Sequence, residues 1–183
     1  MAKSDEELVS LAQVGDQVAF DELVARHQDR VFALSFRILA NAEDAADIQQ
    51  ETFVRAWTSL RTFKRQAAFS TWLHRITVNL CLSRKRRSQP VYAELDEERL
   101  SQSESGAVAC MQRAETKAIV QAAIADLPAN YRVLLVLREI EGRSCEEIAL
   151  VVGRSADSVR TGLYRARKLL KERIRPYLEE VDG

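Results

Sequence analysis

The sequence contains few of the residues that form disulfides, bind metals or interrupt regular structure. Its 183 residues include three Cys, two His, six Gly and three Pro. The cysteines are odd in number, lie far apart at Cys81, Cys110 and Cys145, and form no Cys-x-x-Cys pair, so we expect neither a disulfide framework nor a zinc site. The scarcity of Gly and Pro predicts little coil. We expect no metal and no cofactor.

Long apolar runs are also lacking. No stretch approaches the roughly 20 apolar residues that span a bilayer, and residues 1–5 lead into an acidic helix rather than a secretion signal. We therefore expect a cytoplasmic protein without direct membrane insertion. The sequence has no phosphate-binding glycine loop and no Ser or Cys nucleophile with a His partner at a recognisable spacing, which argues against an enzyme.

A net charge is missing as well, because 27 Lys and Arg balance 27 Asp and Glu. The positive and negative charges are nevertheless segregated into different segments of the chain. The net charge is −6 over residues 1–60, +8 over residues 61–92, −4 over residues 93–126 and +2 over residues 127–183. Two basic segments among acidic ones are typical of a protein that contacts DNA at two places and binds a protein partner through an acidic region.

Residues 144–171 have the pattern of a helix-turn-helix. Ser144 and Glu147 have the spacing of a capping box, and Gly153 is placed to take the left-handed conformation that ends a short helix. Ser155 then starts a second helix. Two short helices around a glycine turn are the arrangement that places a recognition helix in a major groove.

The second helix of this pair has an apolar and a polar face. At 100° per residue, one stripe collects Val159, Leu163, Ala166 and Leu170, and the other side is rich in cations. Arginine and lysine on such a helix reach guanine edges or phosphates. The candidate DNA contacts are Ser158, Arg160, Thr161, Tyr164, Arg165 and Lys168. An ordinary solvated cationic helix is the alternative interpretation.

The first 60 residues predict three helices. Ser4 and Glu7 have capping-box spacing, Asp16 is placed to cap a long helix, and Asn41 separates it from a third helix over residues 42–60. We expect that helix to bury Ala45, Ile48, Thr52 and Val54, or residues next to them. Its outer face is acidic and carries Glu43, Asp44, Asp47, Gln50 and Glu51.

Aromatic and basic residues alternate after the third helix. Phe63, Phe69 and Trp72 lie among Arg61, Lys64, Arg65 and Arg75. Flat rings beside cations are surfaces on which single-stranded bases stack, although a place in the hydrophobic core is an equally good interpretation of Phe69 and Trp72. Ser70 is expected to cap a fourth helix, whose basic end at residues 84–87 favours phosphate contact.

A segment without helical periodicity then divides the chain. Pro90 breaks the fourth helix, and Ser, Gln and Glu dominate the residues that follow. We predict an all-α fold with two helical domains, residues 1–88 and 112–183, joined by a flexible acidic linker over residues 89–111. The second domain begins with a helix over residues 112–125 and ends with the helix-turn-helix.

Several ordered motifs together resemble the extracytoplasmic-function (ECF) sigma factors, the small promoter-specificity subunits of bacterial RNA polymerase. They lie at residues 15–20 (GDQVAF), 42–57 (AEDAADIQQETFVRAW), 69–76 (FSTWLHRI), 127–128 (LP), 146–149 (EEIA), 158–160 (SVR) and 165–167 (RAR). The resemblance covers nearly the whole chain. It implies a sigma-2-like bundle over residues 1–88 and a sigma-4-like helix-turn-helix domain over residues 112–183.

The resemblance implies an alternative sigma factor that directs core RNA polymerase to specific promoters and assists DNA melting. On this basis Asp44, Asp47, Gln50 and Glu51 would dock on the clamp helices of the polymerase β′ subunit, with the β subunit as a further partner. The minus-ten element would be bound by Phe63, Lys64, Arg65, Phe69, Trp72, Arg75, Asn79, Arg84 and Arg86. The candidate contacts of the last helix would read the minus-thirty-five element of the promoter DNA.

The resemblance also implies an anti-sigma factor that covers the polymerase-binding surfaces until a stress signal arrives, and that could hold the protein at the inner membrane. Gly162 stands where arginine is common in the family, so a DNA contact is expected to be missing there. His74 and Cys145 occupy positions that are often tyrosine, and we assign them no function.

Two other functions fit parts of the pattern. One is a conventional helix-turn-helix repressor or activator whose first domain senses a ligand or dimerises. The other is an adaptor that holds a protein partner and contacts DNA weakly. The aromatic residues of the basic loop and the acidic third helix favour the sigma factor.

Overall fold

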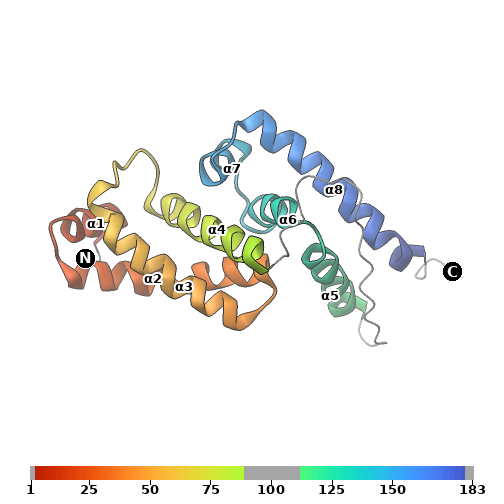
Figure 1. Ribbon diagram of the computed structural model, residues 1–183, viewed down its shortest axis with the longest axis horizontal. Coiled ribbons are helices and arrows are strands. Elements are labelled where there is room, and N and C mark those ends of the chain that lie inside the picture. The colour runs from red at the N-terminus through yellow and green to blue at the C-terminus, as the bar shows by residue number, and fades with distance from the viewer. Residues whose placement is uncertain (1–2, 89–111, 180–183) are drawn as a thin grey trace.

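The computed structural model describes residues 3–88 and 112–179, and each element in these ranges is helical. In chain order the elements are α1 (Asp5–Gln13), α2 (Gln17–Leu39), α3 (Ala42–Ser59), η1 (Leu60–Thr62), α4 (Phe69–Ser88), α5 (Gln112–Ala125), α6 (Ala129–Leu135), η2 (Val136–Ile140), α7 (Cys145–Val152) and α8 (Ala156–Glu179). Figure 1 shows α1–α4 as one bundle and α5–α8 as a second group beside it. The predicted all-α fold with two helical domains is confirmed. The predicted linker, residues 89–111, lies outside the described residues.

The first three helices start where the capping residues predict. Glu7 N–H donates to Ser4 Oγ at 3.3 Å, and Ser4 N–H donates to the Glu7 carboxylate at 2.7 Å, which completes the capping box. Asp16 accepts from Ala19 N–H at 3.0 Å, and Asn41 caps α3 in the same way. These side chains satisfy amide groups that have no partner inside their helices.

Two details of the first half differ from the sequence-based expectation. Helix α4 begins at Phe69, one residue before the predicted cap Ser70, and the carbonyl of Ala68 accepts the first N–H groups of the helix. Helix α3 buries Phe53, whereas Val54 is 64% exposed. The reason is rotational phase, since Val54 lies seven residues after Asp47 and therefore shares its outward face.

The helix-turn-helix of the second half forms as predicted. Ser144 and Glu147 make a complete capping box, and Gly153 ends α7 with a φ of 68°. Ser158 N–H donates to Ser155 Oγ at 3.2 Å at the start of α8. Before α7, the chain passes from α6 through the π-helical turn η2.

Gly162 lies where α8 packs against α6. A Cβ atom on Gly162 would lie 2.5 Å from the Leu134 Cδ1 atom, so the glycine permits a close approach of the two helices. A side chain at this position would point at α6 rather than at DNA. The close packing against Leu134 is therefore a physical reason for a glycine here, and the sequence pattern did not indicate it.

Candidate nucleic-acid and protein interfaces

The exposed side of α3 forms a stripe that is acidic at one end and apolar at the other. Asp47, Gln50 and Glu51 are all exposed on it. One and two turns later come Val54 and Trp57, which are 64% and 37% exposed. The sequence pattern had indicated the acidic part only. The apolar part was missed because Val54 was expected in the core.

A hollow beside Trp57 continues this stripe. It has a volume of about 290 Å³ and is lined by Ala12, Gly15, Trp57, Thr58, Leu60 and Arg61. The Trp57 ring leans on Phe20, with ring centroids 4.8 Å apart, which fixes the indole at the edge of the hollow. The α3 stripe therefore ends in a hollow with both apolar and polar residues in its lining, which is large enough for a protein side chain.

Arg84 connects the acidic stripe to α4. Its guanidinium lies 2.7 Å from the Asp47 carboxylate and 3.3 Å from that of Asp44. The hydrogen bond to Asp47 raises the pKa of Arg84 above its ordinary value. Arg84 lies on the side of α4 opposite Arg75, nine residues earlier, so the structure places it against α3 and apart from the other candidate DNA contacts.

Three aromatic rings form a cluster at the start of α4. The Phe63 and Trp72 rings stack with centroids 4.7 Å apart, and the Phe69 ring lies 5.7 Å from that of Trp72. Phe69 is only 5% exposed, whereas Phe63 and Trp72 are half-buried. Phe69 is thus a core residue that supports the other two rings, and these present partly open faces.

Gln13 holds the loop that carries Phe63, although nothing in the sequence pattern singles it out. Its side-chain amide donates to the backbone carbonyls of Leu60 and Phe63, both at 2.9 Å. Its side-chain oxygen accepts from the Arg65 guanidinium at 2.6 Å. Arg65 has a φ of 55°, an uncommon conformation for a residue other than glycine, and the hydrogen bond to Gln13 helps to hold it.

One face of α4 extends the ring cluster with polar residues. Arg75, Asn79 and Arg86 are exposed, and their spacing of four and seven residues puts them on the same side of the helix as Trp72. Lys64 is exposed on the preceding loop. The structure thus brings most of the predicted minus-ten residues onto one surface that combines partly open rings, cations and an amide.

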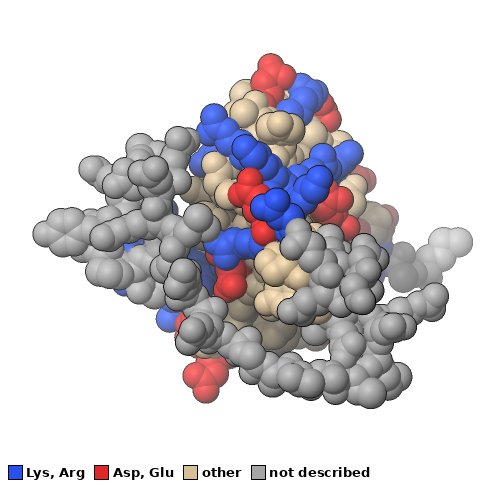
Figure 2. All heavy atoms as spheres, turned by 90° about the vertical axis from the view of Figure 1, so that its right-hand side faces the viewer, with Lys and Arg blue, Asp and Glu red and all other residues tan. Residues whose placement is uncertain are grey.

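The candidate residues of α8 lie on a single exposed face. All six, namely Ser158, Arg160, Thr161, Tyr164, Arg165 and Lys168, are exposed, and Tyr164 is 71% exposed. Val159, Leu163 and Ala166 are buried on the opposite side. Figure 2 shows basic side chains gathered on the end of the molecule where α8 finishes, with a few acidic side chains among them.

Arg160 is already oriented by two carboxylates. Its guanidinium lies 2.6 Å from Asp157 and 2.7 Å from Glu146 on α7. These contacts raise the pKa of Arg160, chiefly through the hydrogen bond to Asp157. Because all three side chains are exposed, the pairs contribute little to stability, but they hold the guanidinium between α7 and the start of α8.

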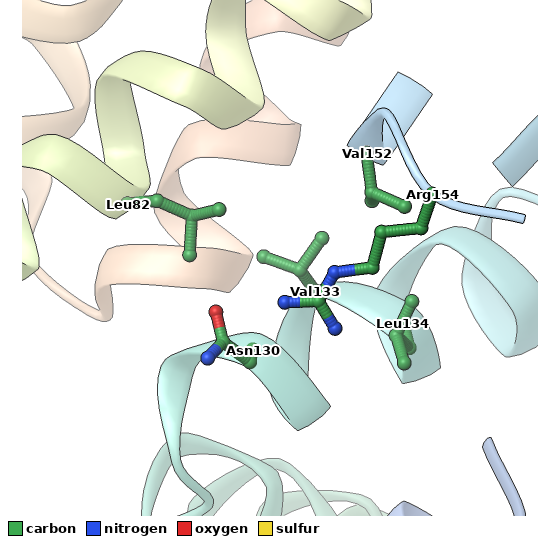
Figure 3. Close-up of a pocket in the computed structure, with 6 residues that line it drawn as sticks. All are labelled: Leu82, Asn130, Val133, Leu134, Val152 and Arg154. Atoms are coloured by element: carbon green, nitrogen blue, oxygen red, sulfur yellow. The ribbon is translucent and has the colours of Figure 1, made fainter. Parts of the chain in front are cut away.

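A small cavity lies between the two halves of the molecule. A cavity of about 30 Å³ is lined by Leu82 of α4, by Asn130, Val133 and Leu134 of α6, and by Val152 and Arg154. Figure 3 shows the Arg154 side chain extending back from the turn over this cavity. A cavity of this size has room for a few water molecules at most and is too small for a substrate.

Two other kinds of site are absent from residues 3–88 and 112–179. No group of three His, Cys, Asp or Glu side chains in these ranges is arranged to hold a metal ion. None of the helices described there is both long enough and apolar enough to cross a bilayer.

Comparison with known proteins gives consistent matches. Residues 23–91 match the family described as Sigma-70 region 2, and residues 117–170 match Sigma-70, region 4. The chain is 37% identical to the RNA polymerase sigma-H factor of Pseudomonas aeruginosa, with 98% of each chain covered. It is 34% identical to the ECF RNA polymerase sigma-E factor of Escherichia coli (strain K12), with 96% of each covered.

A solved structure agrees with these matches. The structure of CnrH in complex with the cytosolic domain of CnrY is 28% identical in sequence. It superposes with a TM-score of 0.68, covering 99% of this chain and all of CnrH. The similarity extends over both helical groups and over the order in which they follow each other.

Proposed function

The chain belongs to the ECF sigma factor family, as an alternative sigma factor that directs RNA polymerase to promoters and is not an enzyme, and from this premise we propose how its surfaces divide the work. Residues 1–88 bind core polymerase and the minus-ten element and assist melting, and residues 112–183 read the minus-thirty-five element. The observation that carries this division is the segregation of exposed residues: acidic and apolar on α3, aromatic and cationic around α4, cationic on α8.

The α3 stripe is the proposed docking surface for core polymerase, with the clamp helices of the β′ subunit as its partner. Asp47, Gln50 and Glu51 supply polar contacts, and Val54 and Trp57 supply the exposed apolar area. Interfaces gain most of their affinity from such apolar and aromatic anchors, while charges at the rim steer the encounter. Asp44, which forms an ion pair with Arg84 beside the stripe, adds a further carboxylate to the acidic end of the stripe.

The surface around Phe63 and Trp72 is proposed to take the minus-ten element as single strand. Removing a base from the stack costs a few kcal/mol, which stacking on a ring and hydrogen bonds to the base edge must offset. The half-buried rings offer a surface for stacking, and Asn79 and Arg75 offer hydrogen bonds to the base edge. Lys64, Arg65 and Arg86 are placed to neutralise phosphates along the same path.

The exposed face of α8 is proposed to enter the major groove of the minus-thirty-five element. The side chains of Arg160, Arg165 and Lys168 contact guanine edges or phosphates, and Ser158, Thr161 and Tyr164 complete the surface. The face is regular because its helix is uninterrupted from Ala156 through Lys168.

An anti-sigma factor is proposed as a regulatory partner. CnrH, to which this chain is 28% identical over its length, was solved in complex with the cytosolic domain of CnrY. A partner of this type would cover the α3 stripe and so keep the protein from core polymerase. We place the protein in the cytoplasm, where core polymerase works, with retention at the inner membrane through such a partner.

Run-off transcription with purified bacterial core polymerase tests the proposal. The wild-type protein should produce discrete starts on pooled genomic promoters, and Asp47→Arg combined with Glu51→Arg should lose them. Val54→Arg is a second test that leaves the Arg84 ion pairs intact. Asp21→Arg, at another exposed acidic position, on α2, is the control and should retain activity.

The alternative function has a distinct result. A conventional repressor or activator would bind duplex DNA but produce no starts with a polymerase that is active with another sigma factor. Full activity of the Asp47→Arg, Glu51→Arg protein and of Val54→Arg would instead mean that the α3 stripe is not the docking surface.

A further inference from the structure

The loop between η1 and α4 is anchored by a side chain of α1. Gln13 is the last residue of α1, which contacts η1. Its Nε2 atom donates to the carbonyls of Leu60 and Phe63 at 2.9 Å each, and its Oε1 atom accepts from the Arg65 guanidinium at 2.6 Å. Both the donor and the acceptor of the amide thus have partners in one short segment, which begins at η1 and continues into the loop.

The partners of Gln13 require an amide at this position. The two carbonyls accept hydrogen bonds and cannot donate them, whereas the guanidinium of Arg65 donates and cannot accept. A glutamate in place of Gln13 would have no donor for the carbonyls, and a lysine would have no acceptor for Arg65. The contact therefore depends on the chemistry of the side chain and not on its volume alone.

The helix that carries Gln13 is itself held at several points. Leu8 and Val9 of α1 are 3% and 1% exposed and belong to the core of the first bundle. At the start of α1, the Asp5 carboxylate lies 2.7 Å from Nε2 of His27 on α2. Gln13 therefore reaches the loop from an element that packing and polar contacts fix against the rest of the bundle.

Arg65 gives the loop a particular need for this anchor. Its φ of 55° lies in the left-handed region, which is unfavourable for a residue that has a Cβ atom. The hydrogen bond to Gln13 offsets part of that cost. Without it, the loop would relax toward conformations with a negative φ at Arg65, and the path of the chain after Phe63 would change.

The anchored backbone belongs to a ring of the surface around Phe63 and Trp72. The Phe63 carbonyl accepts from Gln13, and the Phe63 N–H donates to the Leu60 carbonyl at 3.0 Å, so the peptide groups on both sides of Phe63 are held. The ring between them stacks on Trp72 with centroids 4.7 Å apart. A surface that is ordered before its ligand arrives loses less affinity to the ordering of loops and side chains on binding.

We propose that Gln13 is a positioning residue for promoter opening, which holds the loop so that Phe63 and Trp72 meet the single-stranded minus-ten element in a fixed arrangement. Gln13 acts through the backbone of the loop and through Arg65, and not by touching a base. The inference rests on the proposed function of the surface around Phe63 and Trp72. Without the anchor, the holoenzyme still binds duplex DNA through α8 but captures the melted strand more weakly.

Gln13→Met is the first test, because methionine is similar in length and volume but makes none of these hydrogen bonds. Holoenzyme with the full chain is titrated with two probes from a start mapped by run-off transcription: the single non-template strand of the minus-ten region, and a duplex that carries the minus-thirty-five region alone. The variant should bind the single strand about tenfold more weakly than wild type and the duplex equally well. Gln17→Met, at an exposed position of α2, is the matched control and should bind both probes as wild type does.

Two results of this titration would contradict the inference. Equal affinity of Gln13→Met and wild type for the single strand would show that the loop does not need the anchor. An equal loss on both probes would show that Gln13 only stabilises the folded protein.

Arg65→Gly provides the second test. Glycine adopts a φ of 55° without steric cost, so the loop keeps its path without the bond from position 65, while the two carbonyl contacts of Gln13 remain. In the Arg65→Gly background, Gln13→Met should therefore weaken single-strand binding only about threefold. The lost cation does not affect this comparison, because both proteins in it lack Arg65.

The same loss in both backgrounds would overturn the inference while leaving the proposed function intact. Absence of starts from the wild-type protein, with a polymerase that is active with another sigma factor, would overturn the proposed function and this inference with it.

Discussion

The two halves of the molecule display their DNA-binding candidates in different ways. On α8 they stand on one exposed face of a continuous helix. In the first half, Phe63 and Trp72 are half-buried on Phe69, and Gln13 holds the loop in place. A duplex offers a regular groove that a helix face fits, whereas a base outside the stack needs an irregular, partly enclosed surface. The construction of each half thus follows the form of DNA it is proposed to bind.

The halves also differ in their interiors. The buried polar residues of the first half are His27, Ser35, Thr52, Thr71, His74 and Thr77, whereas in the described part of the second half the corresponding residue is Arg132. A buried polar group is favourable only while its partners are in place. The first half should therefore respond more strongly to pH than the second, and the predictions below test both contrasts.

The largest expected effect concerns His74 and pH. Burial, followed by the charges of Arg143, His27 and Arg30, lowers the pKa of His74 from 6.5 to about 4. Between these values the unfolded chain binds a proton that the folded protein does not. Folding stability should therefore fall as the pH drops from about 6.5 to about 4, by about 3 kcal/mol in total. Urea unfolding at a series of pH values measures this loss.

The variant His74→Gln isolates this contribution. Glutamine does not titrate, so the variant should lose the His74 part of the pH dependence and keep the part that carboxylates such as Asp5 and Glu147 contribute at lower pH. Identical stability profiles for wild type and variant would show that the first half does not have the pH-sensitive interior we describe.

The next largest effect is expected at the surface around Phe63 and Trp72. Trp72→Ala removes the partner of Phe63, and transcription from a duplex promoter should fall about 30-fold, since stacking of a base on a ring contributes about 2 kcal/mol. Trp72→Phe keeps a flat ring and should retain most of the activity. Run-off transcription is compared with the thermal stability of each variant. If transcription fell only in proportion to the loss of folded protein, Phe63 and Trp72 would be core residues. The contrast between the DNA-binding surfaces of the two halves would then disappear.

A smaller effect is expected on α8. Arg160→Ala removes two exposed ion pairs, which should leave stability nearly unchanged, while holoenzyme affinity for its promoter should fall about tenfold. The loss should vanish on a promoter with a scrambled minus-thirty-five element. Arg167→Ala is a matched control, because Arg167 is also exposed but pairs with Glu139. Filter binding on both promoters measures the difference, and an equal loss on both would show that Arg160 does not read sequence.

The features that could be predicted from the sequence are those that depend on residues close in the chain. The caps Ser4, Asp16, Asn41 and Ser144 and the left-handed Gly153 were predictable because each depends on neighbours within four residues. The α8 face was predictable because a helix has a fixed period. The all-helical architecture followed from these local signals, and the two domains followed from the segment after Pro90 that lacks helical periodicity.

Features that depend on distant neighbours were not predictable in this way. Gln13 contacts a loop about 50 residues away, and Arg84 turns toward α3 because the packing of two helices decides which side of α4 faces Asp47. Val54 was placed in the core because its apolar character was given more weight than its rotational phase. The hydrophobic core that the two helical groups share likewise has no signal within either half.

Gly162 belongs to this second group, and its substitution should have the smallest effect. The sequence alone gives a helical glycine that costs about 1 kcal/mol relative to alanine, so Gly162→Ala would be expected to stabilise the protein. The structure predicts the opposite sign, because the new Cβ would lie 2.5 Å from Leu134 Cδ1, in a core where overpacking costs about 1 to 3 kcal/mol. We expect a net destabilisation of about 1 kcal/mol, or a melting temperature about 3 °C lower.

The neighbouring Thr161→Ala, on the exposed face of α8, is the control for Gly162→Ala and should change stability by less than about 0.5 kcal/mol. Gly162→Arg should lower the melting temperature further and add no affinity for the minus-thirty-five element, because its side chain starts toward α6. A Gly162→Ala protein as stable as wild type would show that Leu134 moves aside freely. The regular outer face of α8 would then owe nothing to the close packing on its inner side.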